Sequence, residues 1–172
     1  MTEQALRLER LQARHDLEQF DSGKEDLDGW LRRHALAAQP MDSARTFVVE
    51  RDGRVVGYFA LTMGSLQRAE APPGLVRGLP SYPIGMVLLA RLAVDRQWQG
   101  RGVGATLLAE ALRKAVAAGE AATARLVAVD AIDESAARFY GRFGFIPVPE
   151  HPLRLYRRMR DIRHSLDRTG GC

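Results

Sequence analysis

The first candidate for chemistry in the sequence is a glycine-rich turn at residues 99–104. Glycines stand at alternate positions 100, 102 and 104, directly after the apolar residues 88–94 and before the amphipathic residues 105–116. Glycine lets the backbone turn tightly and approach a ligand without a Cβ in the way, and a helix N-terminus favours negative charge. The pattern therefore predicts a phosphate cradle. Its residues are Gln99, Gly100, Arg101, Gly102, Val103 and Gly104.

Two common phosphate-binding patterns do not fit this turn. A P-loop ends in Gly-Lys-Ser/Thr, whereas here Gly104 is followed by alanine. A dinucleotide-binding fold spaces its glycines Gly-x-Gly-x-x-Gly in a first βα unit, whereas this turn reads Gly-x-Gly-x-Gly and lies past the middle of the chain. Both nucleotide hydrolysis of the Walker type and dinucleotide binding are disfavoured.

The flanking patterns predict the elements that position the turn. Residues 6–11 indicate a short strand, and residues 22–38 a helix that opens with a capping box and buries Leu27, Trp30 and Leu31. His34 lies on the same stripe, which favours a core or interface histidine. An Asp-Gly turn at 52–53 joins two β-rich runs into a hairpin.

The rest of the chain continues the alternation of strands and helices. A long loop is predicted at 65–83, a helix after the glycine turn, and a second helix at 133–143. The remaining strands are 88–94, 124–131, 145–148 and 153–159. Since the helix after the turn provides a crossover, strand 124–131 should lie parallel to strand 88–94. The order β-α-β-β-β-α-β-α-β-β predicts an α/β fold with a mixed sheet.

Composition limits the class of protein. The 172 residues suit a single domain, 1–172, and no apolar run reaches the length of about 20 residues that a membrane span needs. The first residues lack a signal-peptide pattern, so we expect a cytoplasmic protein that does not enter the membrane. The one cysteine, Cys172, and the spacing of the four histidines predict no metal site.

Basic charge gathers near the C-terminus. Residues 151–172 hold six arginines and two aspartates, against a net charge of +4 for the whole chain. A polyanionic partner such as RNA would favour this segment, because phosphate neutralisation dominates such affinities. The alternative is a solvated basic tail from about residue 160.

The turn and a second motif resemble the GNAT superfamily of N-acetyltransferases. Gln99 to Gly104 follows the pattern Gln/Arg-x-x-Gly-x-Gly/Ala after a strand, and residues 139–145 match the GNAT ending "FYxxxGF". The resemblance implies a GNAT fold, a mostly antiparallel sheet of six to seven strands with a central splayed parallel pair. It also implies that acetyl-CoA is the cofactor and that its pyrophosphate lies on the glycine turn.

The same resemblance implies roles for single residues. The backbone of Leu92, Ala93 and Val94 would pair with the pantetheine arm, and Ser135 would contact the pantetheine or pyrophosphate region. Tyr140 would face the sulfur of the cofactor. Because a phenol with a pKa near 10 stays protonated at pH 7, Tyr140 is the expected general acid for the departing thiolate. The alternative is a tyrosine packed among aromatic residues.

A narrower resemblance concerns the acceptor. Residues 20–31, 44–48, 89–95 and 139–140 are similar to the GNAT toxins of bacterial toxin–antitoxin systems. Those enzymes acetylate the α-amine of aminoacyl-tRNA, block translation and are neutralised by a ribbon-helix-helix antitoxin. The resemblance implies a tRNA-binding role for four arginines, each of which could equally be an ion-pair partner. They are Arg45, Arg91, Arg142 and Arg154.

No carboxylate stands out as a general base. Glu50 and Asp95 are candidates, although each suits a surface or turn charge, and this gap favours a weakly basic α-amine acceptor. Two alternatives to the toxin stay open: a GNAT that acetylates a small amine, an antibiotic or a protein N-terminus, and a non-catalytic acyl-CoA-binding module. A homodimer is compatible with the sequence, which does not decide the oligomeric state.

Overall fold

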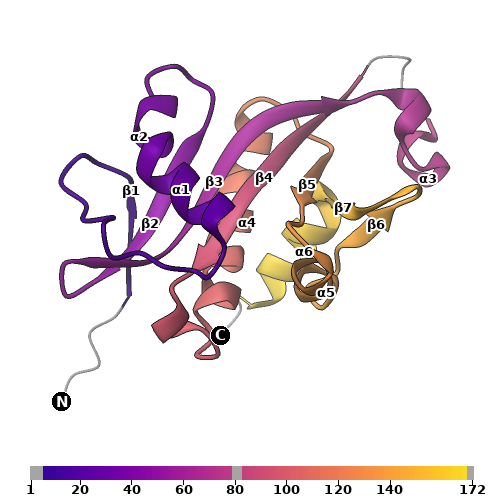
Figure 1. The fold of residues 1–172 in the computed structure, drawn as a ribbon. Coiled ribbons are helices and arrows are strands. Elements are labelled where there is room, and N and C mark those ends of the chain that lie inside the picture. Colours follow the sequence, from indigo (N-terminus) through magenta and orange to yellow (C-terminus); the bar gives the residue numbers. More distant parts are fainter. Residues whose placement is uncertain (1–5, 79–82, 170–172) are drawn as a thin grey trace. The chain divides into compact units, whose positions relative to one another are not determined.

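Seven strands form one mixed sheet in the order β1-β2-β3-β4-β5-β7-β6 (Figure 1). The structure is a computed structural model that describes residues 6–78 and 83–169. The strands are β1 Arg7–Arg10, β2 Arg45–Arg51, β3 Arg54–Leu66, β4 Ile84–Val94, β5 Leu126–Asp130, β6 Ile146–Val148 and β7 His151–Arg158. The helices are α1 Glu25–Arg33, α2 Ala35–Ala38, α3 Pro73–Val76, α4 Val103–Ala121, α5 Glu134–Gly141 and α6 Met159–Thr169, with 3-10 turns η1 Arg68–Glu70 and η2 Arg96–Trp98.

The α/β fold with a mixed, mostly antiparallel sheet is confirmed. Contacts divide the chain into two compact units, residues 1–62 with 90–111 and residues 63–89 with 112–172. β3, β4 and α4 each contribute residues to both units. That the whole chain is one domain stays a prediction, as does the splay of the central strands. Among the described residues no helix has the length and apolar character to cross a bilayer.

The first unit is built on the predicted hairpin. β2 and β3 pair antiparallel around Asp52 and Gly53, whose φ angles of 51° and 79° suit a two-residue type I′ turn. The predicted first strand is present as β1, which pairs antiparallel with the outer edge of β2. One apolar cluster joins these strands to α1 and to β4, through Leu31, Val48, Tyr58 and Ala93. The end of β4 is thereby fixed against a rigid core.

The predicted helix 22–38 is shorter and begins later than expected. The capping-box prediction is wrong: Lys24 is the N-cap, and Ser22 instead donates its Oγ hydrogen to Asp28 Oδ1 at 2.5 Å. The helix breaks at His34, which is exposed and so is no core histidine. The apolar face is as expected, with Leu31 fully buried beside Leu27 and Trp30.

The second unit holds the predicted parallel pair. β4 and β5 pair in register from Met86 with Leu126 to Leu89 with Val129. β7 runs antiparallel to both β5 and β6. As predicted, α5 is capped by Asp133, whose side chain accepts a hydrogen bond from Ala136 N at 2.8 Å.

Two segments differ from expectation. The predicted loop 65–83 keeps only short helical pieces, as expected, but β3 continues to Leu66; residues 79–82 of it lie outside the described residues, as does Cys172. Residues 159–169 of the basic segment form the helix α6 and not an irregular tail, and Met159 and Ile162 are buried. An amphipathic helix of this kind needs an apolar surface to cover, which β5 and β7 provide.

Candidate functional site

The glycine turn leaves a run of backbone N–H groups available. Gly100 and Gly102 have φ angles of +77° and +82°, and a Cβ built on either would meet nothing within 4 Å. Thr106 N donates to Gly102 O at 3.1 Å, the first turn of α4. Within the described ranges, the N–H groups of residues 100–105 have no protein acceptor. N–H donors without a protein acceptor at the start of a 19-residue helix are suited to phosphate.

Gln99 fixes this turn by its side chain. Its Nε2 donates to Val94 O at 2.8 Å and to Ser22 O at 2.9 Å. Both amide hydrogens are therefore used in holding the turn to the end of β4 and to the loop before α1. Gln99 was predicted to bind the cofactor, and the structure gives its amide nitrogen a supporting role.

The end of β4 and the residue after it are firmly placed. Ala93 is buried in the core of the first unit, and Leu92 and Val94 are half-buried. Asp95, a candidate base, is buried, and its carboxylate accepts from Asp21 N at 3.1 Å and from Gln97 N at 2.9 Å. Because this carboxylate caps η2 and each of its oxygens accepts a backbone N–H, Asp95 is a buried turn residue with a structural role.

Tyr140 lies in the second unit, near the C-terminal end of α5. Its side chain is 5% exposed, and its ring meets Phe139 and Phe145 edge-on at centroid distances of 5.3 Å and 5.9 Å. Burial raises the pKa of Tyr140 above the ordinary tyrosine value. The hydroxyl makes no hydrogen bond to the part of the chain that the structure describes. The phenol is thus protonated, rigid and uncommitted.

Ser135 occupies the exposed first turn of the same helix. It lies close to Asp133, whose carboxylate is committed to the N-cap. Its hydroxyl is open to a ligand, and its contact with the cofactor stays a prediction.

The four candidate arginines fall into two pairs. Arg45 donates to Asp42 Oδ1 at 2.6 Å, and Arg154 donates to both carboxylate oxygens of Asp130 at 2.7 Å and 2.8 Å. These two are ion-pair partners, the alternative that the sequence left open. Arg91 and Arg142 have no carboxylate partner among the described residues and instead lie 4.2 Å and 5.8 Å from the ring centroids of Trp30 and Phe139.

Arg154 also lines a cleft of about 600 Å³ in the second unit. Its other charged lining residues, apart from His151, are Glu70, Asp130 and Glu150. Three carboxylates beside one committed guanidinium do not suit a phosphate.

The arginines of the basic segment are mostly paired as well. Asp161 lies 3.0 Å from Arg158 and 3.8 Å from Arg160. Arg157 donates to Ser165 Oγ, and burial lowers its pKa. The basic segment therefore presents less free charge than its composition predicts.

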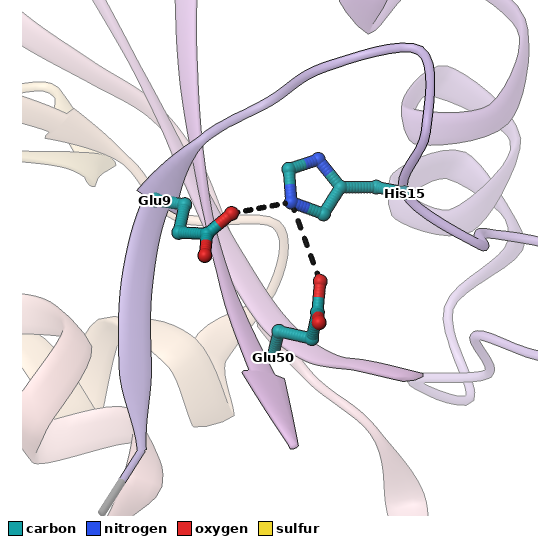
Figure 2. A group of neighbouring side chains, drawn as sticks. All are labelled: Glu9, His15 and Glu50. Atoms are coloured by element: carbon teal, nitrogen blue, oxygen red, sulfur yellow. Dashed lines mark hydrogen bonds and ion pairs between the residues drawn. The ribbon is translucent and has the colours of Figure 1, made fainter. Parts of the chain in front are cut away.

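One cluster of titratable groups was not found from the sequence. Figure 2 shows His15 between Glu9 and Glu50, with Nε2 3.0 Å and 3.4 Å from their carboxylates. The three ligand-type atoms lie within 4.8 Å of one another, although the sequence predicted no metal site. Arg14 pairs with both glutamates and Arg7 with Glu9, so the two negative charges are already balanced. Glu50, the other candidate base, belongs to this ion-pair network.

Comparisons with known proteins place these features in context. Residues 42–147 match the model of the acetyltransferase (GNAT) domain. The chain is 42% identical over 154 residues to a tRNA-acetylating toxin of Mycobacterium tuberculosis (strain ATCC 25618 / H37Rv), covering 90% of this chain and 92% of that protein.

Solved structures agree over a similar extent. AtaT complexed with acetyl-methionyl-tRNAfMet superposes with a TM-score of 0.86 at 32% identity, covering 94% of this chain and 99% of that one. A mutant AtaT toxin bound to the C-terminus of the antitoxin AtaR and acetyl-CoA gives a TM-score of 0.82 at 32% identity, covering 94% and 98%. The likeness extends over nearly the full length of both chains.

Proposed function

This chain belongs to the GNAT acetyltransferases, and we propose that it transfers the acetyl group of acetyl-CoA to the α-amine of aminoacyl-tRNA, as the toxin of a toxin–antitoxin pair. The observation that carries the proposal is the 42% identity to a tRNA-acetylating toxin over 90% of the chain. The proposal is supported by a glycine turn whose N–H groups have no protein acceptor among the described residues and by a buried tyrosine whose pKa is raised. Charged tRNA is a cytoplasmic substrate, so we place the activity in the cytoplasm.

The glycine turn is proposed to hold the pyrophosphate of acetyl-CoA. The N–H groups of residues 100–105 donate to its oxygens, and the positive end of the α4 dipole adds to the attraction. The backbone of Leu92 and Ala93 pairs with the pantetheine arm. Val94 O already accepts from Gln99, so the pairing depends mainly on the two residues before it.

Tyr140 is proposed as the general acid. The neutral α-amine attacks the thioester carbonyl, a C–N bond forms and the C–S bond breaks. The departing thiolate takes the phenolic proton of Tyr140. The attacking amine releases a proton to solvent, and the tyrosinate takes up a proton from solvent to complete the cycle. Because burial raises the pKa of Tyr140, its phenol does not ionise near neutral pH. It therefore keeps the proton that it donates across the working pH range.

The acceptor is proposed to be bound through unpaired guanidiniums. Arg91 and Arg142 carry charge that no described carboxylate neutralises, which suits the phosphates of a tRNA acceptor end. An α-amine with a pKa of about 7.7–8.0 is already partly neutral at pH 7, so a reaction without a dedicated base is chemically sufficient. A ribbon-helix-helix antitoxin is the proposed partner that neutralises the enzyme.

The test incubates the protein with labelled acetyl-CoA and total charged tRNA, with uncharged tRNA and a panel of small amines as controls. Label on charged tRNA alone supports the proposal. Label on small amines alone identifies a small-molecule acetyltransferase, and thiol release with no acceptor at all contradicts transfer. Since phosphate contacts weaken with salt, the KM for charged tRNA should rise steeply with ionic strength while the KM for acetyl-CoA rises less.

A companion experiment uses induced expression in a bacterial host. The parent protein should arrest growth, and Tyr140→Phe should not. Co-expression of the cognate antitoxin should restore growth with the parent.

A further inference from the structure

Two arginines from different elements share one tryptophan. Arg51 is the last residue of β2, and Arg101 lies in the glycine turn. The Cζ atom of each lies 4.9 Å from the ring centroid of Trp98, the last residue of η2. All three residues belong to the first unit.

Neither guanidinium is neutralised. Among residues 6–78 and 83–169, no carboxylate pairs with Arg51 or Arg101. The contrast is Arg45 of the same strand, which pairs with Asp42 at 2.6 Å. A guanidinium held against a ring keeps its N–H edge free for a second partner and loses less side-chain freedom when it binds. The two charges are therefore held ready for anions.

The position of Arg101 indicates which anion comes first. Arg101 lies within the turn whose free N–H groups are proposed to bind the pyrophosphate of acetyl-CoA. Arg51 comes from a separate strand. Because the Cζ atoms of Arg51 and Arg101 each lie 4.9 Å from the same ring centroid, the distance between them is at most twice that value. It thus offers a second cationic group beside the first. Acetyl-CoA carries one further anionic group besides the pyrophosphate, the 3′-phosphate of its ribose.

We propose that Arg51, held on Trp98, binds the 3′-phosphate of coenzyme A while Arg101 and the glycine turn bind the pyrophosphate. The inference rests on the proposed function, since it takes acetyl-CoA as the ligand. Arg51 touches the cofactor, and Trp98 acts as a positioning residue through it. The enzyme consequently discriminates coenzyme A from its 3′-dephospho form.

The test measures the affinity of the full-length protein for coenzyme A and for 3′-dephospho-coenzyme A by calorimetry. The parent should prefer coenzyme A by about tenfold, the effect of one charge-assisted hydrogen bond. Arg51→Ala should bind the dephospho form as the parent does and lose the preference. The matched control is Arg54→Ala, which removes the same charge from the facing strand of the hairpin, three residues along the chain, and should keep the preference.

Variants of Trp98 test the positioning role. Trp98→Phe retains an aromatic ring and should retain most of the preference, whereas Trp98→Leu should reduce it with little change in affinity for the dephospho form. The KM for charged tRNA should be the same in Arg51→Ala and in the parent.

Each other outcome overturns a distinct statement. A parent that binds neither ligand contradicts the proposed function. A parent that binds both ligands equally, or an Arg51→Ala variant that still prefers coenzyme A, overturns the inference alone. A raised KM for charged tRNA in Arg51→Ala assigns this arginine to the nucleic acid and overturns the inference as well.

Discussion

Replacing Tyr140 by phenylalanine should remove turnover and leave the fold and cofactor binding intact. The side chain is 5% exposed, and its ring packs on Phe139 and Phe145, contacts that phenylalanine keeps. Its hydroxyl makes no hydrogen bond within the described residues, so the free energy of unfolding should change by no more than about 0.5 kcal/mol. Loss of the general acid should lower kcat by about 10²–10⁴-fold.

Tyr58 provides a matched control. It too is a buried tyrosine whose pKa is raised by burial, but its hydroxyl donates to Leu27 O at 2.7 Å. Tyr58→Phe removes that hydrogen bond, which should cost about 1 kcal/mol and lower Tm by about 2–4 °C. Its kcat should stay near that of the parent. The two variants thus separate the loss of a proton donor from the loss of a buried hydroxyl.

The assay combines thermal unfolding, coenzyme A binding and acetyl transfer to charged tRNA. In the parent, kcat/KM should rise as the α-amine loses its proton near pH 7.7–8.0 and stay level to about pH 10, because burial raises the pKa of Tyr140 above its ordinary value. A Tyr140→Phe enzyme that keeps kcat within about tenfold of the parent would refute the assignment. So would a fall in the parent's kcat/KM between pH 8 and 9.

Three further predictions follow from the structure. Gly102→Ala and Gly53→Ala each place a Cβ in open space at positive φ, so each should lower the free energy of unfolding by about 1–2 kcal/mol. Calorimetry should detect weaker coenzyme A binding only for Gly102→Ala. Arg91→Ala should raise the KM for charged tRNA and reduce the slope of log KM against log salt by about one, whereas Arg154→Ala, whose guanidinium is committed to a carboxylate, should leave both unchanged. The hydrogen bond from His15, helped by neighbouring arginines, lowers the pKa of Glu9. The stability that Glu9 contributes is therefore present above its unfolded pKa and lost as pH falls through its folded pKa. The free energy of unfolding should accordingly fall less with decreasing pH in Glu9→Gln than in the parent.

Elements with a local signal were predictable from the sequence. The hairpin around Asp52 and Gly53 follows from turn chemistry and β-rich flanks, and the helix after Gly102 follows from its apolar spacing. The capping box failed because Ser22 has a competing acceptor in Asp28, which the motif does not consider. Local patterns identify an element better than they identify the partner of a polar side chain.

Features that depend on long-range contacts were not predictable. Arg45 and Arg91 look alike in the sequence, yet Arg45 pairs with Asp42, whereas the guanidinium of Arg91 lies over the ring of Trp30. Likewise, the histidine spacing gave no sign that His15 would lie between two glutamates from different strands. Folding determines whether an arginine pairs with a carboxylate. Only the candidate arginines without such a partner stay available to bind the substrate.

The two tryptophans give the molecule built-in optical probes. The sequence contains only Trp30 and Trp98, and each has an arginine guanidinium close to its ring, at 4.2 Å and 4.9 Å respectively. Indole emission responds to nearby charge, so an anion that binds the arginine beside a ring changes the fluorescence of that tryptophan. Variants that retain one tryptophan at a time would therefore report separately, without any added label, on the binding of each of the two proposed substrates.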